Sequence, residues 1–468
     1  MSKYPLSLML TACILTAAGR VAASDGYYDP IWPAGIGGGY FAFNGDYAHP
    51  AEDTYASMLT VDASGNAILG GTINGTWWLG ELFANGSFVP TFGLADGSGR
   101  TNGCSMSGLC NSSYPFSAAA LGDGRYLILG GSTLTLTTSA AHDASVSVPV
   151  DHLMINDAQG YVSGRGVVAL PGGGAIVVGD GFYSAISGVS GFGVARLTST
   201  LMLDTSFNTV TDNQSVTFAG GAVYPIGPGP VVRADAALVQ PDGRIVIVGV
   251  TGDIAVGGAV GLIRLNPDGS LDATFGTGGK LTVSLSGHPN EMGYLLAPIL
   301  DRAGRIVIGT SQPDAVHGSS GMLIVRVNAN GSPDFFPPIQ ANAFPSTCDY
   351  IDQRGSVAID SAGRILVSGY CASGTKDKFA VVRLRGDTGV VDASFGIGGL
   401  SYGWFDATSS EDWALATAFD HSGHPLVAGF TSPASSGHKA GIARLSYDLI
   451  FTNDLEAAPR GCLPPQCN

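Results

Sequence analysis

The chain has 468 residues, of which 69 are Gly, 45% are hydrophobic and 13% are charged. This composition is typical of short strands joined by tight turns, and it excludes a disordered chain. The formal net charge of −15 argues against nucleic-acid binding, which needs a cationic surface. The length exceeds that of one ordinary core, although a ring of repeats can reach it within one domain.

The N-terminus has the pattern of a secretory signal peptide, residues 1–24. Lys3 is followed by an apolar stretch, Leu6 to Ala18, and by the small residues Ala22-Ala23-Ser24. We therefore expect a secreted or periplasmic protein without a transmembrane segment, since no later apolar run approaches the roughly 20 residues of a spanning helix. An alternative is a lipoprotein anchored through Cys13, because Leu10-Thr11-Ala12-Cys13 resembles a lipidation motif.

A hairpin pattern recurs along the rest of the chain. In Ala237–Val250, two apolar strands flank a Pro-Asp-Gly turn, which is a strong hairpin signal. Similar stretches return roughly every 60 residues, a period typical of propeller blades. They are Leu59–Gly71, Ala119–Gly131, Val168–Gly179, Ile299–Gly309, Ile359–Gly369 and Phe419–Gly429. Each repeat reads as strands A, B, C and D, and in the fourth repeat these are residues 236–240, 244–250, 261–266 and 280–285.

Two segments of the fourth repeat, Gln240–Gly249 and Asp268–Lys280, together resemble the delta-60 repeat of bacterial secreted proteins. Leu203–Phe207 and Val391–Gly399 carry the same pattern, and the resemblance extends from about Ala56 to Leu445. It implies a β-propeller-like array, and it implies no particular chemistry.

The two ends of the array complement each other. Gly35–Phe43 resembles the D-strand segments Phe275–Leu285 and Phe395–Phe405, but it precedes the first A strand. The seventh repeat has no such segment after its C strand, Lys439–Ser446. The sequence therefore predicts an all-β fold, a seven-bladed β-propeller of four-stranded antiparallel blades over residues 25–447, closed by an N-terminal D strand and followed by a tail, 448–468.

An Arg in strand C recurs with an Asp in the segment that follows it. The pairs are Arg196 with Asp204, Arg264 with Asp272, Arg326 with Asp334 and Arg383 with Asp392. In the first repeat Glu81 and Val89 replace both members together. This pattern predicts a structural ion pair in each C–D hairpin.

The long insertions all fall in B–C or D–A connections, which share one face of an antiparallel blade. They are residues 94–115, 133–150, 209–233, 341–354 and 406–412. Variable loops on a rigid scaffold usually carry binding, so we expect a macromolecule or glycan to bind this loop face. Aromatic residues near it, among them Trp404 and Trp413, suit carbohydrate stacking or core packing.

Acidic residues recur just before strand A and are the candidate binding residues. They are Glu52, Asp53, Asp235, Glu291, Asp349, Asp352, Glu411 and Asp412. At a channel mouth they would suit a Ca²⁺ or cationic-ligand site, or general acid–base catalysis. The other interpretation is that each acid accepts a hydrogen bond from a neighbouring blade.

Six cysteines besides Cys13 predict disulfides in an exported chain. We expect Cys104 to pair with Cys110, Cys348 with Cys371, and Cys462 with Cys467. No spacing of Cys and His indicates zinc.

No nucleophile elbow, HExxH motif or phosphate loop occurs. The first hypothesis is thus a monomeric, secreted binding scaffold without enzymatic activity or a cofactor. The alternatives are an exported hydrolase or lyase that uses the channel-mouth carboxylates, with Ca²⁺ in one version, and a structural surface protein held by its tail.

Overall fold

The computed structural model describes residues 29, 32–33, 40–43, 53–62, 64–73, 76–92, 100–102, 116–121, 125–130, 133–138, 147–149, 153–156, 160–183, 189–208, 216–218, 220–227, 231–253, 257–284, 298–313, 320–335, 348, 350–352, 355–374, 376–433 and 437–446. All secondary structure in these residues is β, and no helix occurs among them. We number the sets of strands as units 1 to 7, after the sequence repeats that form them.

The first three units follow one another in the chain. Unit 1 contains β2 (Thr54–Val61), β3 (Ala67–Ile73), β4 (Thr76–Leu82) and β5 (Arg100–Asn102). Unit 2 contains β6 (Phe116–Ala120), β7 (Arg125–Gly130), β8 (Thr133–Thr138) and β9 (Ser147–Pro149). Unit 3 contains β11 (Gly160–Ala169), β12 (Ala175–Tyr183), β13 (Val189–Leu197) and β15 (Gly221–Tyr224), flanked by β10 (Leu153–Asn156) and β14 (Val216–Phe218).

The remaining units have the same order of strands. Unit 4 contains β16 (Val231–Val239), β17 (Ile245–Asp253), β18 (Gly257–Leu265) and β19 (Lys280–Ser284). Unit 5 contains β20 (Ile299–Leu300), β21 (Ile306–Pro313), β22 (Ser320–Val327) and β23 (Pro333–Phe335). Unit 6 contains β24 (Tyr350–Asp352), β25 (Val357–Ile359), β26 (Ile365–Ser373), β27 (Lys376–Leu384) and β28 (Leu400–Gly403). Unit 7 contains β29 (Ser409–Phe419), β30 (Pro425–Pro433) and β31 (Lys439–Arg444).

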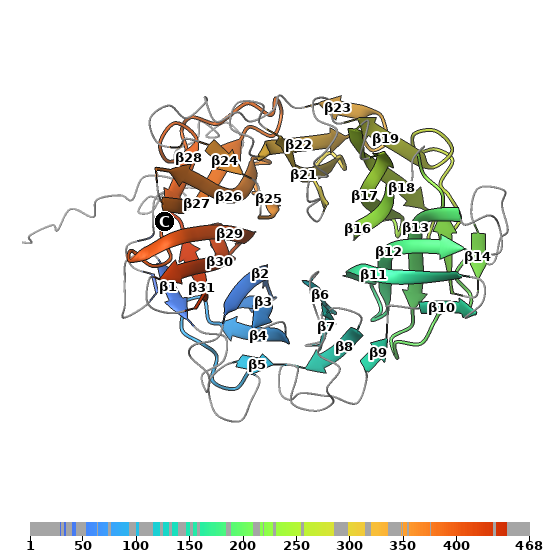
Figure 1. Cartoon of the computed structure of the whole chain (residues 1–468), viewed down its shortest axis with the longest axis horizontal. Helices are drawn as coiled ribbons and strands as arrows, with labels where there is room; N and C mark the ends of the chain where they lie inside the picture. Colours follow the sequence, from blue (N-terminus) through green and yellow to red (C-terminus); the bar gives the residue numbers. More distant parts are fainter. Residues whose placement is uncertain are drawn as a thin grey trace, which may run out of the picture.

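The units form antiparallel sheets arranged around a common centre, as in a β-propeller (Figure 1). The A strands β2, β11, β16 and β29 lie nearest to this centre. Units 6 and 7 belong to one nine-stranded sheet, but a single parallel pair, Asp377 with Glu411, connects them. Because neighbouring strands within each unit are antiparallel, the A–B and C–D turns lie at one end of the sheets, which we call the turn end. The B–C and D–A connections lie at the other end, which we call the loop end.

The N-terminal strand β1 (Tyr40–Phe43) lies against the last strand of the chain. It pairs antiparallel with β31, from Tyr40 opposite Ala443 to Phe43 opposite Ala440. On its other side, the Phe43 ring packs edge-on against Trp78 of unit 1, with 5.6 Å between centroids. The β1 strand thus extends the sheet of unit 7 and contacts unit 1.

The innermost strands carry a β-bulge at a common position. The register shifts after Ala56 in β2, Gly164 in β11, Ala234 in β16 and Ala414 in β29. Opposite each bulge, the B strand has a glycine whose added Cβ would meet a backbone oxygen of the A strand. These distances are 1.8 Å at Gly71, 1.6 Å at Gly179, 2.0 Å at Gly249 and 1.8 Å at Gly429. Close backbone approach explains the glycine that ends these four hairpin patterns.

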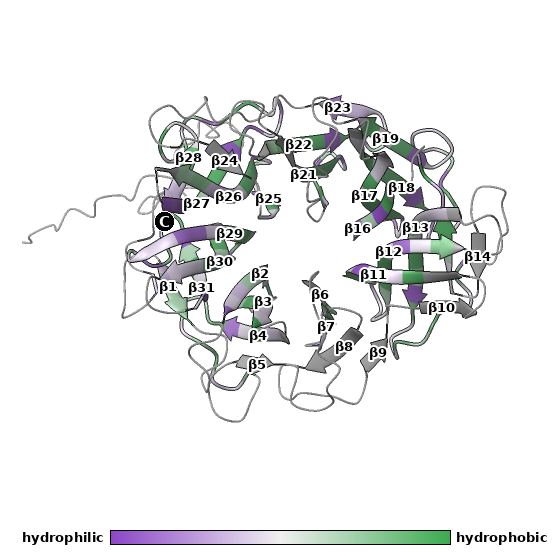
Figure 2. Cartoon of the chain, viewed as in Figure 1, coloured by the Kyte–Doolittle hydropathy of each residue, from purple (hydrophilic) through white to green (hydrophobic). Residues whose placement is uncertain are grey.

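The hydrophobic core lies between neighbouring sheets. One cluster joins Ile176 and Phe192 of unit 3 to Ile245 and Ile263 of unit 4. Another joins units 7 and 1 through Ile442, Phe43 and Trp78 among others. Apolar colour runs along central strands such as β18 and β26 (Figure 2). Each sheet therefore buries its two faces against two different neighbours, which fixes the order of the units.

The predicted Arg–Asp pairs are confirmed. Their N–O distances are 3.1 Å for Arg196–Asp204 and 2.8 Å for Arg264–Asp272, Arg326–Asp334 and Arg383–Asp392. In the first repeat, where the pair is replaced, Glu81 accepts a hydrogen bond from Asn66 at 2.7 Å, and burial raises the Glu81 pKa.

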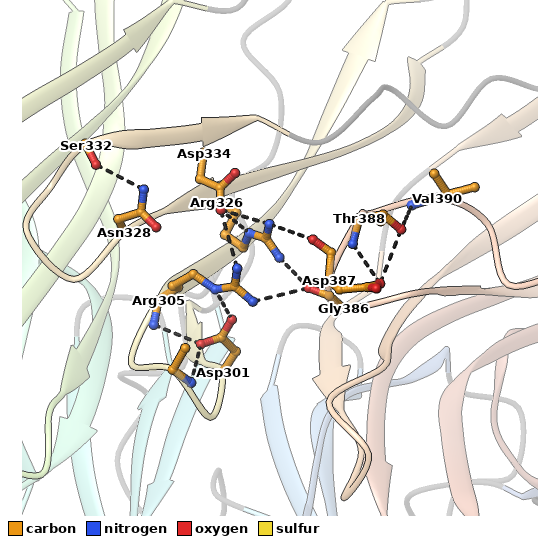
Figure 3. A network of polar contacts seen from close by, with 11 residues as sticks. Asp301, Arg305, Arg326, Asn328, Ser332, Asp334, Gly386, Asp387, Thr388 and Val390 are labelled. Carbon is orange, nitrogen blue, oxygen red and sulfur yellow. Dashed lines mark hydrogen bonds and ion pairs between the residues drawn. The ribbon is translucent and has the colours of Figure 1, made fainter. Parts of the chain in front are cut away.

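The arginines also connect neighbouring units, which the sequence did not predict. Arg326 donates to the backbone oxygens of Gly386 and Asp387 in the C–D turn of unit 6 (Figure 3). Arg196 donates to Pro267 of unit 4 at 2.9 Å, and Arg264 donates to Ala329 of unit 5. Each of these arginines therefore joins its own C–D hairpin to the next unit.

At the last C strand, the same arrangement uses residues from the N-terminal region. Arg444 pairs with Asp29 at 2.6 Å and donates to the backbone oxygen of Ala84 in unit 1 at 3.2 Å. Its guanidinium lies over the Trp32 ring, as that of Arg264 lies over Phe275, with centroid distances of 5.6 and 4.7 Å. Asp29 and Trp32 thus take the places that Asp272 and Phe275 have in unit 4.

Candidate functional site

The eight acids predicted from the sequence divide into three groups. Glu52, Glu291 and Asp349 lie outside the described residues, and Asp352 lies in β24, where only the backbone is described. The side chains of Asp53, Asp235, Glu411 and Asp412 are described. Asp235, Glu411 and Asp412 lie within A strands rather than before them, because the bulge lets the strand continue toward the loop end.

Asp412 is buried at the junction of units 6 and 7. Its Oδ1 accepts the backbone N–H groups of Phe405 at 2.7 Å and Asp406 at 3.3 Å. Burial raises its pKa to about 6, although these hydrogen bonds oppose the shift. Asp412 thus holds the end of unit 6 against unit 7.

Asp235 belongs to a group of four charges where units 3 and 4 meet. Arg233 donates to Asp235 at 2.6 Å, and Arg165 donates to Asp180 at 2.8 Å. Burial raises the pKa of Asp235, and Arg233 opposes that shift. Each carboxylate is therefore neutralised by its own guanidinium group, which suits a structural role.

Asp53 lies where unit 1 meets unit 7. Its Oδ1 accepts the backbone N–H of His438 at 2.7 Å and lies 3.0 Å from His438 Nδ1. The backbone hydrogen bond lowers the pKa of Asp53. The hydroxyl of Tyr55 lies 3.1 Å from the same ring nitrogen.

Glu411 is exposed and is paired through its backbone with Asp377 at the start of β27. Asp377 Oδ2 accepts the indole N–H of Trp413 at 3.0 Å. Burial raises the pKa of Asp377, and the nearby charge of Glu411 adds to this effect. Within the described part of the chain, no cation forms an ion pair with either carboxylate.

A row of rings runs along these acids from unit 6 through unit 7 to unit 1. Tyr370 stacks on Trp413 with 4.4 Å between centroids and 8° between planes. Trp413 contacts Phe430 at 5.3 Å, and Phe430 contacts Tyr55 at 5.0 Å. Tyr370 and Phe430 are buried, whereas Trp413 and Tyr55 are half-buried. We call Tyr370, Trp413, Phe430, Tyr55 and His438 the aromatic row.

Sequence reasoning named only Trp413 from this row. Tyr370 and Phe430 directly follow the glycine that ends the B-strand pattern, Gly369 and Gly429. The other repeats have Thr72, Ser132, Asp180, Val250 and Thr310 there, and a comparison of that one position would have singled out two neighbouring repeats.

The predicted disulfide between Cys348 and Cys371 is confirmed, with a Cα–Cα distance of 5.3 Å. It ties residue 348 to β26 beside Tyr370, at the loop end. Cys13, Cys104, Cys110, Cys462 and Cys467 lie outside the described residues.

The part of the chain that the structure describes brings together no group of three or more His, Cys, Asp or Glu side chains able to hold a metal ion. Within the same residues, no helix is long and apolar enough to cross a membrane.

Residues 174–207 and 240–275 match the model of a family described as a domain of unknown function (DUF5122) beta-propeller. These segments lie in units 3 and 4. The match supports a propeller-type repeat and assigns no activity. No curated protein matches the chain in sequence.

Several solved structures resemble the chain. A protein of unknown function from Dyadobacter fermentans is 10% identical with a TM-score of 0.40, over 87% of this chain and 98% of the other. Puromycin hydrolase is 14% identical with a TM-score of 0.39, over 89% of this chain and 63% of the hydrolase. The Dos1 propeller is 10% identical with a TM-score of 0.39, over 84% and 78% of the two chains. Similarities this distant support no inference about activity.

Proposed function

We propose that this chain is a secreted scaffold that binds a glycan at its loop end through the aromatic row. The observation that carries the proposal is the continuous contact of rings across three units, with Asp377, Glu411 and Asp53 beside them. Sugar rings place their apolar faces on aromatic side chains, while carboxylates accept hydrogen bonds from sugar hydroxyls. A partly exposed row flanked by acceptors combines both requirements.

The scaffold in this proposal is a seven-bladed ring formed by residues 25–447, after removal of the signal peptide, with the tail 448–468 outside it. Two contacts support closure by the N-terminal region. The β1 strand pairs with β31, and Arg444 joins Asp29 to Ala84. Pairing the first and last strands leaves no exposed sheet edge at the junction.

A second candidate function is an exported glycan hydrolase or lyase. The observation in its favour is the pair formed by Asp377 and Glu411, in which burial and a neighbouring charge raise the pKa of one carboxyl. Two acids with different pKa values are the usual arrangement for general acid–base catalysis. The version that requires Ca²⁺ is tested by adding a chelator.

The test is binding of the full chain to a panel of soluble polysaccharides in affinity electrophoresis, with reducing-end release measured in parallel. We expect Trp413→Ala to weaken binding by about two- to tenfold, since stacking on an aromatic ring contributes about 0.5–1.5 kcal/mol. The matched control is Trp404→Ala. Trp404 is also half-buried, but it contacts Lys376 and Lys378 outside the row. Binding to no polysaccharide, or equal binding by both variants, would overturn the proposal, and release of reducing ends would favour the enzyme.

A further inference from the structure

The aromatic row is built from two copies of one arrangement. Trp413 and Tyr55 occupy the same position in their A strands, immediately before the residue at which the bulge begins. Tyr370 and Phe430 occupy the same position in the B strands of the preceding units. Asp377 and His438 each lie six residues before the C-strand arginine of their unit, Arg383 and Arg444.

The first copy, at the junction of units 6 and 7, has four members. Tyr370 stacks on Trp413, and Trp413 donates to Asp377 at 3.0 Å. Glu411, two residues before Trp413, pairs with Asp377 through the backbone. We call these four residues station one.

The second copy, at the junction of units 7 and 1, repeats these relations with different residues. Phe430 contacts Tyr55 edge-on rather than stacked, with 66° between the planes, and the Tyr55 hydroxyl lies 3.1 Å from His438 Nδ1. Asp53, two residues before Tyr55, contacts the same histidine at 3.0 Å. We call these four residues station two. Trp413 and Phe430, at 5.3 Å, connect the two stations.

The arrangement ends on both sides. The B-strand position of unit 5 holds Thr310, and that of unit 1 holds Thr72. At the junction of units 3 and 4 the equivalent positions hold Asp180 and Arg233, which are engaged in ion pairs. In the described residues, therefore, contact of a B-strand ring with the next unit's A-strand ring occurs at two adjacent junctions, as a stacked pair at one and an edge-on pair at the other.

We propose that the two stations are tandem subsites for a neutral glycan chain, and that each station binds one segment of the same chain. This inference rests on the proposed function and specifies its ligand class. A scaffold that presents one arrangement twice, in adjacent units, suits a ligand with its own repeating unit. Binding at one station raises the effective concentration of the chain at the other, so affinity grows without any new type of contact.

The charge of the stations disfavours an acidic chain. Asp377, Glu411 and Asp53 place carboxylates at both stations, and the ammonium groups of Lys376 and Lys378 lie over the rings of Trp404 and Tyr402 instead. A glycan with a carboxylate on each sugar would meet like charges at both stations, which costs affinity.

The experiment is a titration of the full chain with cello-, malto- and manno-oligosaccharides of increasing length, from one to about six sugars, followed by Trp fluorescence and calorimetry. We expect affinity to rise by about 10–100-fold between one sugar and the length that reaches both stations, and then to level off. Alginate oligomers of the same lengths are the acidic comparison and should bind at least about tenfold more weakly.

The variants Trp413→Ala and Tyr55→Ala each remove one station. Each should abolish most of the gain with length while changing the affinity for a single sugar by only about twofold, because the other station remains. Trp404→Ala should keep the full gain. Because the length series on the unmodified chain needs no variant, a misfolded variant leaves the test intact.

Two results would overturn the inference in distinguishable ways. Binding of neutral glycans with an affinity that does not depend on length would refute tandem subsites while leaving glycan binding in place. Binding of none of these oligomers, and of no polysaccharide, would refute the proposed function as well.

Discussion

The side chains at the turn end repeat from unit to unit, whereas those at the loop end differ between junctions. At the turn end, the Arg–Asp pair recurs in units 3, 4, 5 and 6 with N–O distances of 2.8 to 3.1 Å. At the loop end, equivalent positions hold rings at the junctions around unit 7 and ion pairs at the junction of units 3 and 4. The interactions that repeat hold the C–D hairpins and neighbouring units together, whereas the side chains at the loop end differ from junction to junction.

The side chains at the loop end can differ between units because the backbone there has the same conformation in several of them. The bulge and the glycine opposite it recur in β2, β11, β16 and β29, whichever side chains stand beside them. The residue before the bulge therefore projects from a fixed position, as Tyr55 in unit 1 or Trp413 in unit 7. One substitution per strand is enough to change the chemistry of a junction.

The largest effect should come from breaking a repeated pair at the turn end. Arg383→Met leaves the Asp392 carboxylate without its guanidinium partner in a site where the arginine is fully buried. We expect a loss of about 3–5 kcal/mol in the free energy of unfolding, measured with urea. The matched control is Arg196→Met, where about a third of the arginine side chain is exposed and the loss should stay near 1 kcal/mol or less. Equal losses at both sites would contradict this account of the turn end.

An intermediate effect of the opposite sign is expected at the loop end. The pKa of Asp412 is raised from 3.8 to about 6, so the stability that this group contributes is complete below pH 3.8 and is lost as pH rises through 6. Asp412→Asn keeps an oxygen that accepts the N–H of Phe405 and removes the buried charge. It should raise the free energy of unfolding by up to about 3 kcal/mol at pH 8 and by little at pH 4. Melting curves at both pH values test this, and destabilisation at pH 8 would show that the charge is needed.

The smallest effect is expected from Asp53→Asn. The lowered pKa of Asp53 means that its contribution to stability is present above pH 3.8 and is lost as pH falls through its folded pKa. About half of this side chain is exposed, so the loss at pH 7 should be below about 1 kcal/mol. Melting temperatures at pH 7 and pH 3 should show the difference between variant and wild type shrinking at the lower pH. A difference that grew as the pH fell would contradict a lowered pKa of Asp53 and the stabilising hydrogen bond from His438 that causes it.

Features that depend on short sequence distances were predictable. Asp272 lies eight residues after Arg264, so the ion pair follows from the geometry of one hairpin. The Cys348–Cys371 bridge followed from assigning both residues to the loop end of one blade. The sequence predicted Asp235, Glu411 and Asp412 to precede strand A, whereas they lie within it. The reason is that the strand continues past the bulge, and the only trace of the bulge in the sequence is the glycine opposite it in strand B.

The aromatic row was not predictable, because its members come from three units. Tyr55 and His438 are 383 residues apart, and no local pattern relates them. The bonds from Arg196 and Arg326 to the next unit depend in the same way on how sheets face one another. The repeats in the sequence predict the strands and pairs within each unit. Contacts between units can be predicted only when the spatial arrangement of the units is known.

The contact between Asp29 and Arg444 also bears on the order of events during synthesis. Its partners are 415 residues apart, and β1 is made long before β31 exists to pair with it. A chain that leaves the ribosome N-terminus first must keep the edge of β1 unpaired while several hundred residues follow. The earliest strand is thus among the last to find its place, and contacts of such long sequence separation are slow to form and expose the growing chain to aggregation.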